Sequence, residues 1–256
     1  MSWILLRGLT REARHWNGFA GQLAQQLGNE EVVALDLPGN GEFCAQTSPG
    51  KVHGLVEFLR QQLRIKGLQT PCKLLAMSLG GMVAVDWAQR YPAEVTRLVL
   101  INTSMRPFSS VTQRLRPGNW LQLALLAARW RDTDHAERVI HQLTCNNTIS
   151  QDQDQDLAAW RHIRKSAPVT ASNAARQLWA AAGFSCAAAA PPCATLVLSS
   201  AADHLVHPIC SARLAGAWQA THLQHPWAGH DLPHDDADWV CRQVMAWLDA
   251  TGIPRN

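Results

Sequence analysis

Residues 73–88 read KLLAMSLGGMVAVDWA, an apolar run that leads through Ala76-Met77-Ser78-Leu79-Gly80-Gly81 into a helical pattern. A strand that turns sharply into a helix needs small residues on both sides of the turn, because larger side chains would clash there. Ala76 and Gly80 meet that need two positions before and two positions after Ser78. The stretch predicts a serine at the positive end of a helix, where a developing anion is favoured. Capping of that helix is the alternative role for Ser78.

Short apolar runs alternate with helical patterns on both sides of this stretch, which is typical of βαβ units and a parallel sheet. Within each run the apolarity is continuous, as expected for strands that are covered on both faces. The expected strands are residues 3–6, 31–37, 72–77, 97–101, 194–199 and 221–224, and the expected helices are residues 16–28, 51–66, 79–90, 207–218 and 236–250.

The alternation stops in the middle of the chain, where no convincing strand occurs. Residues 119–130 and 156–167 instead read as amphipathic helices. We therefore expect an α/β core made of residues 1–104 and 191–256, with residues 105–190 inserted as a helical cap.

Composition restricts the classes of protein to be considered. The chain has 256 residues, 47% of them apolar and 17% charged, which is enough for one large domain and argues against long disorder. The net charge of +3 comes from dispersed residues, so no nucleic acid is expected as a partner. Seven cysteines without a CxxC pair indicate reduced thiols. The first apolar run has only four residues, so we expect a cytoplasmic protein without stable membrane insertion.

A serine hydroxyl is a weak nucleophile and needs an adjacent base that is itself oriented by a carboxylate. Asp203 follows a late strand and His230 lies in the loop between the last strand and the last helix. Because parallel strands present their carboxyl ends at one edge, both side chains can reach the edge where Ser78 lies. The alternatives are a helix-capping role for Asp203 and the use of His234 as the base in place of His230.

Three segments resemble the α/β-hydrolase fold family. Residues 76–80 are similar to its nucleophile elbow, G-x-S-x-G, with Ala76 in place of the first Gly. DLPGNG at 36–41 is similar to a D-x-P-G-x-G segment, and AGHDLPHDDADWV at 228–240 is similar to the family's His loop. The resemblance implies a mostly parallel sheet flanked by helices with an inserted helical cap, and the chain order Ser, acid, His.

The resemblance also implies roles for individual residues. Ser78, Asp203 and His230 would form the catalytic triad, and the backbone N–H groups of Leu9 and Leu79 would form the oxyanion hole. The position where the family usually carries His is occupied by Arg7. We expect Arg7 to form a structural ion pair with an acid such as Glu12; contact with a substrate carboxylate is the alternative.

The substrate is predicted less sharply, because in this fold specificity resides largely in the cap. Bulky residues are expected around the substrate, and the candidates are Arg7, Trp16, Trp120 and Trp130. Arg106, Arg114 and Arg116 form a cluster that either guides an anionic substrate or acidic carrier or is simply solvated. His222 and His225 have the spacing of metal ligands, but a strand would point them to opposite sides, so no metal is expected.

The chain further resembles small bacterial carboxylesterases, including those that act on carrier-bound acyl methyl esters. This likeness implies a serine esterase that cleaves an ester or thioester with an apolar acyl group. The expected partner is a small-molecule ester or thioester substrate, with an acyl carrier protein as a further candidate, and no cofactor is expected. The alternatives are a carbon–carbon bond hydrolase or lyase on the same triad, or a catalytically silent binding protein of the same fold.

Overall fold

A single six-stranded parallel sheet forms the centre of the computed structural model, which describes residues 1–28, 30–147 and 150–252. The strand order is β2-β1-β3-β4-β5-β6, and every neighbouring pair is parallel. The expected α/β fold is confirmed, with each strand within two residues of its predicted bounds. The strands are β1 (Trp3–Leu6), β2 (Val32–Leu35), β3 (Cys72–Met77), β4 (Val95–Ile101), β5 (Ala194–Ser200) and β6 (Thr221–His225).

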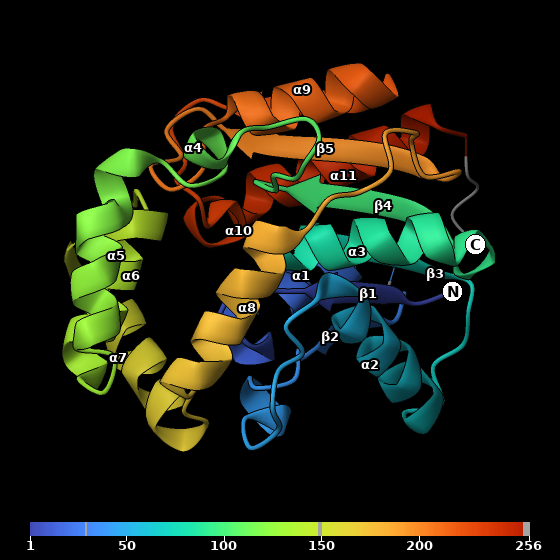
Figure 1. Cartoon of the computed structure of the whole chain (residues 1–256). Helices are drawn as coiled ribbons and strands as arrows, with labels where there is room; N and C mark the ends of the chain where they lie inside the picture. Colours follow the sequence, from blue (N-terminus) through green and yellow to red (C-terminus); the bar gives the residue numbers. More distant parts are fainter. Residues whose placement is uncertain (29, 148–149, 253–256) are drawn as a thin grey trace.

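Helices cover both faces of the sheet (Figure 1). Alternate residues of β1 show the division: Trp3 and Leu5 belong to one buried cluster, Ile4 and Leu6 to the other. The first cluster lies under α1 (Phe19–Gln26) and α11 (Ala237–Ala250). The second lies under α2 (Val52–Ile65), α3 (Leu79–Arg90) and α9 (Ile209–Trp218).

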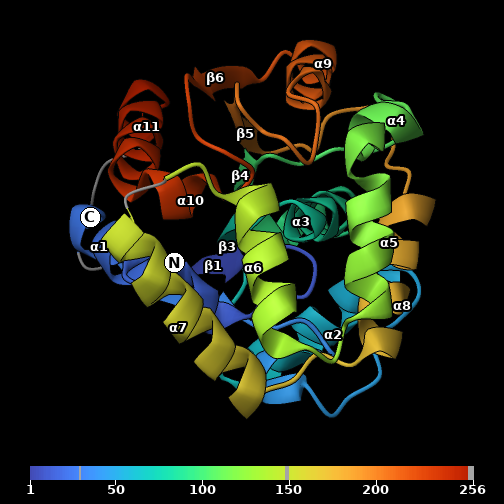
Figure 2. The same cartoon turned by 90° about the vertical axis from the view of Figure 1, so that its left-hand side faces the viewer.

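The chain between β4 and β5 forms helices that gather at the end of the sheet toward which the strands point (Figures 1 and 2). The expected helices near 119–130 and 156–167 are confirmed as α5 (Trp120–Ala128) and α7 (Ser150–Ser166). Three helices were missed: the short α4 (Val111–Arg114), α6 (Thr133–Thr144) and α8 (Ala171–Gly183). The side chains of Asp132 and Thr170 cap α6 and α8, respectively.

The strand order reverses direction at β1, whose two neighbours are β2 and β3. In open parallel sheets, such a reversal leaves a crevice at the carboxyl ends of the two strands, because the connections leave in opposite directions. The loop after β1 begins at Arg7 and the turn after β3 begins at Ser78. The fold therefore opens next to the serine that the sequence singled out.

Two further features concern the whole chain. All seven cysteines are free thiols, as the sequence predicted. In the part of the chain that the structure describes, no helix combines the length and apolarity that crossing a lipid bilayer requires.

Candidate active site

Ser78 sits at a strained turn between β3 and α3. Its φ of 53° and ψ of −118° lie in a region that L-residues rarely adopt, at a cost on the order of 1–3 kcal/mol. Neighbouring backbone holds it there: the Ser78 N–H donates to the carbonyl of Ile101 at 3.0 Å. The Thr103 hydroxyl donates to the Ser78 carbonyl at 2.8 Å. The Ser78 side chain makes no capping hydrogen bond to α3, so its hydroxyl is not used as an N-cap.

Two glycines allow the loop after β1 to lie against this turn. A Cβ on Gly80 would stand 2.5 Å from the Leu6 carbonyl oxygen, and a Cβ on Gly8 would stand 3.1 Å from the Ser78 Cβ. Leu9, which follows Gly8, lines the same cavity as Ser78. Leu79 is the first residue of α3, and intrahelical bonding leaves the first N–H groups of a helix free. The two predicted oxyanion donors therefore come from two different segments, Leu9 from the loop after β1 and Leu79 from the start of α3.

Asp203 and His230 form a buried pair. Nδ1 of His230 lies 2.7 Å from Oδ2 of Asp203, and the two residues are 3% and 1% exposed. The other carboxylate oxygen accepts the N–H groups of Leu205 at 2.8 Å and Val206 at 2.9 Å. Burial by itself would lower the pKa of His230, but the negative charge and hydrogen bond of Asp203 raise it overall.

His234, the alternative base, is engaged elsewhere. Its Nε2 lies 2.8 Å from Oδ2 of Asp156, on the cap helix α7. The structure therefore pairs His230, and not His234, with Asp203.

Arg7 forms a structural ion pair, but the predicted partner, Glu12, is wrong. Its guanidinium donates two hydrogen bonds to the buried carboxylate of Asp231, at 3.0 and 2.5 Å. Glu12 instead accepts hydrogen bonds from Arg14. Burial would raise the pKa of Asp231, but the charge and hydrogen bonds of Arg7 lower it overall. Arg7 thus braces the residue that directly follows His230.

Two other side chains brace the same loop and were missed in the sequence. The Asn102 amide donates to the carbonyls of His230 at 2.8 Å and Gly229 at 3.2 Å. The Asp235 carboxylate accepts the N–H of Gly229 at 2.6 Å and that of Asn146, at the end of α6, at 3.0 Å. A signal for Asn102 existed: it is a polar residue immediately after the buried strand β4, at the edge where Ser78 lies.

Ser78 and His230 both line one cavity of about 290 Å³ under the cap. Of the four predicted pocket residues, Arg7 and Trp130 line this cavity. Trp16 lies on a separate surface hollow, and Trp120 is half-exposed. Most of the lining is apolar, and its larger members include Leu9, Leu115, Leu123, Leu126, Ile140, Leu143, Leu178 and Leu205.

The three cap arginines neither point into the cavity nor form a merely solvated face. Arg106 and Arg114 donate to carbonyls at the carboxyl end of α8, between residues 181 and 184. Such donors neutralise the free carbonyls and the negative dipole end of a helix. Arg116 donates to the Asp203 carbonyl at 2.8 Å. These arginines therefore hold the cap and the acid loop in place.

The two histidines considered as metal ligands are separated, as expected from their strand. His222 contacts the Ser199 hydroxyl at 2.8 Å, whereas His225 contacts Asp236 at 3.2 Å. A different group, His141, Cys145 and His234, brings possible ligand atoms within 4.8 Å of one another. This group was not found in the sequence, although His141 and Cys145 stand four residues apart at the end of α6.

Comparison with known proteins identifies relatives along the whole chain. A family model described as alpha/beta hydrolase fold matches residues 4–237. The putative carbamate hydrolase RutD of Variovorax paradoxus is 26% identical over 270 residues, covering 98% of this chain and 94% of the relative. The biotin biosynthesis bifunctional protein BioHC of Teredinibacter turnerae is 35% identical over 102 residues, covering 40% of this chain and 17% of that protein.

Two further similarities concern an esterase and a solved structure. The pimeloyl-acyl-carrier-protein methyl ester esterase of Nitrosospira multiformis is 30% identical over 104 residues, 40% of this chain and 38% of the relative. The crystal structure of the enol-lactonase from Burkholderia xenovorans LB400 matches with a TM-score of 0.80 at 19% identity, covering 97% of this chain and 91% of that one. At that identity, the likeness to the lactonase concerns the fold.

Proposed function

This chain belongs to the α/β-hydrolase fold family, and we propose that it is a serine hydrolase that cleaves a carboxylic ester or thioester. One observation carries the proposal: a serine on a strained turn and a buried Asp203–His230 pair border the same cavity. A scaffold used only for binding would have no need for either feature.

The proposed reaction has two steps. The Ser78 hydroxyl attacks the carbonyl carbon while Nε2 of His230 takes its proton, and the nearby Asp203 carboxylate stabilises the imidazolium. The N–H groups of Leu9 and Leu79 receive the oxyanion, and His230 returns the proton to the departing alcohol or thiol. Water then attacks the acyl-enzyme with His230 as the base, which releases the acid and restores Ser78.

An apolar acyl group is the substrate part that best fits the leucine-rich cavity. The name of the Nitrosospira relative, a methyl ester esterase for a carrier-bound acyl group, supports an acyl ester with a small alcohol as its leaving part, the acyl part being free or attached to an acyl carrier protein. Each buried methylene contributes about 0.8 kcal/mol, so kcat/KM should rise about fourfold per added methylene until the cavity is full. A profile that is flat with chain length, measured with p-nitrophenyl esters, would argue against an apolar acyl site.

Labelling with a fluorophosphonate probe tests the nucleophile. The native protein should react covalently at Ser78. Ser78→Ala should lose labelling, and its turnover should fall on the order of 10⁶-fold. Absence of labelling in the native protein would favour the silent binding module. Labelling without turnover of any ester would favour the carbon–carbon bond hydrolase or lyase.

Substitution of His230 tests the base. His230→Ala should abolish ester turnover, because no other described imidazole pairs with Asp203. His222→Ala is the matched control, since His222 lies on the edge strand β6, contacts Ser199 and lies outside the cavity lining. Equal losses in the two variants would refute the assignment of His230.

A further inference from the structure

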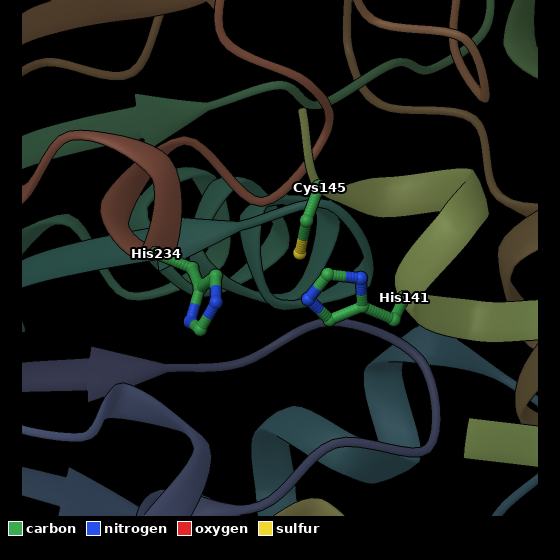
Figure 3. Close-up of side chains that lie close together, drawn as sticks. All are labelled: His141, Cys145 and His234. Carbon is green, nitrogen blue, oxygen red and sulfur yellow. The ribbon is translucent and has the colours of Figure 1, made fainter. Parts of the chain in front are cut away.

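Four side chains with metal-binding chemistry meet between the cap and the loop that carries His230. His141 and Cys145 come from the end of α6, one helical turn apart, so they share a face. His234 comes from α10 (Leu232–Asp235), which follows the His230 loop. Figure 3 shows the Cys145 sulfur and the two imidazole rings turned toward a common point. Their potential ligand atoms all lie within 4.8 Å of one another.

Asp156 on α7 completes the set. Its Oδ2 lies 2.8 Å from Nε2 of His234 and 3.8 Å from Nε2 of His141, so one carboxylate oxygen faces both rings. Tetrahedral zinc with ligands at about 2.0–2.3 Å holds neighbouring ligand atoms about 3.3–3.8 Å apart. The group of His141, Cys145 and His234 has to contract to reach that spacing, and the Asp156 oxygen, which faces both rings but lies outside that group of three, has to rotate toward the ion.

The cluster is not satisfied by the hydrogen bonds that it makes. Nε2 of His141 is buried and has no hydrogen-bond partner among the described residues, although His141 is only 3% exposed. A buried ring nitrogen without a partner is costly, on the order of 1–3 kcal/mol. Cys145 is 7% exposed, so its sulfur also lies away from solvent. The Thr144 hydroxyl lies 3.5 Å from the Cys145 sulfur. Ligation by an ion would therefore satisfy the His141 nitrogen and replace a weak contact of the thiol.

The cluster also has a neighbouring amide at His234 and a route to solvent. Nδ2 of Asn17 lies 3.2 Å from Nδ1 of His234. When Nε2 of His234 binds a metal, Nδ1 carries the proton, and a flip of the Asn17 amide presents its oxygen as the acceptor that metal-bound histidines usually have. A surface hollow is lined by Asn17, Asp156 and His234, so an ion can reach the cluster from solvent.

We propose that His141, Cys145, Asp156 and His234 bind one divalent transition-metal ion, with zinc as the favoured ion. Thiolate and imidazole ligands select zinc over calcium or magnesium, which prefer oxygen. Binding displaces a proton from the Cys145 thiol, so the ion with one thiolate and one carboxylate is a neutral unit. None of the four residues lines the Ser78 cavity, and four protein ligands leave no open position for substrate.

The ion would therefore act as a structural cross-link between the cap and the core. It joins two cap helices, α6 and α7, to α10, only a few residues after His230. A metal that binds the folded state alone raises the temperature of unfolding, because its binding free energy adds to that of folding. The proposal does not depend on the chemistry assigned to Ser78.

Metal binding to the whole protein provides the test. After dialysis against a chelator, the chain should bind about one Zn²⁺ per molecule and unfold at a higher temperature with Zn²⁺ than without. Loading with Co²⁺ should give a thiolate-to-cobalt charge-transfer band, which reports directly on Cys145. Cys145→Ala should lose the band, His141→Gln should lose stoichiometric binding, and Asn17→Ala should weaken binding about 10–100-fold.

Matched controls use the same residue types elsewhere. Cys193→Ala and His222→Gln should keep both the stoichiometry and the cobalt band, because neither residue belongs to the cluster. If the native protein binds no zinc stoichiometrically and shows no cobalt–thiolate band, the proposal is overturned. Equal loss in the control variants would overturn it too. Labelling of Ser78 is read separately, so a silent serine would refute the proposed function and leave the metal site standing.

Discussion

His230 shows two opposing effects acting on a single side chain. Burial disfavours its charged form, whereas Asp203, hydrogen-bonded to it at 2.7 Å, favours that form and raises the pKa overall. As a base, His230 must be neutral. A raised pKa keeps the ring protonated to higher pH, so activity should fall as the pH drops through that raised value.

The pH profile of kcat/KM for an ester substrate checks this. We expect the acidic limb to have its midpoint above 6.5, the usual value for histidine. Asp203→Asn should move that limb to lower pH and reduce kcat by about 10⁴-fold, because the carboxylate that orients the ring is lost. An acidic limb that stays in place in Asp203→Asn would mean that another group controls it.

At the scale of elements, the site depends on how closely β1 and α3 approach. The helix begins against the end of the strand, and a Cβ on Gly80 would meet the carbonyl oxygens of Leu6 and Arg7 at 2.5 and 2.6 Å. Both obstacles are backbone atoms, which cannot rotate away. The elbow and the loop that carries Leu9 must therefore separate if this residue becomes larger.

Gly80→Ala is expected to destabilise the fold by about 1–3 kcal/mol, as overpacking does, and to lower kcat by displacing the oxyanion donors. Gly216→Ala on α9 is the matched control, because a Cβ there has nothing within 4 Å. In a helix interior that change should stabilise by about 0.5–1 kcal/mol. Urea unfolding measures both, and a neutral Gly80→Ala would contradict the close approach.

At the scale of the whole molecule, the cap is docked onto the core through a buried charge network. Glu137 on α6 binds Arg11, in the loop after β1, at 2.6 Å and Arg164 on α7 at 3.0 Å. Each guanidinium also stacks on a tryptophan: Arg11 lies 4.1 Å from the ring centre of Trp160, and Arg164 lies 4.0 Å from that of Trp130. One carboxylate thus links core and cap, and it compensates two buried cations.

Removing that charge should be far more damaging than removing an exposed one. Glu137→Gln leaves two buried guanidiniums without a counter-charge, and we expect a loss of about 3–5 kcal/mol in the free energy of unfolding. The exposed pair of Glu42 and Lys66 serves as the control, since Glu42→Gln should cost at most about 1 kcal/mol. Equal shifts of the urea midpoint in the two variants would show that the network does not dock the cap.

The amino-acid sequence was sufficient to predict the six strands, the order of the elements and the turn at Ser78. These features depend on residues that are close together in the sequence. Strands covered on both faces are continuously apolar, as in Cys72–Met77, and a strained turn requires small neighbours. The helices flanking the sheet were also predicted. In the cap, α6 and α8 were missed although Asp132 and Thr170 cap them, and although Ala136, Val139 and Leu143 give α6 one apolar face.

Which residues the polar and charged side chains pair with could be determined only from the folded structure. Arg7 could pair with any nearby acid along the chain, but its partner is Asp231, 224 residues away. Asn102 and the cluster of His141, Cys145 and His234 are likewise assembled from distant segments. Burial follows from a pattern that repeats over a few residues, so it can be read along the chain. The partner of a polar side chain depends on distances in space, which only the packing of the elements determines.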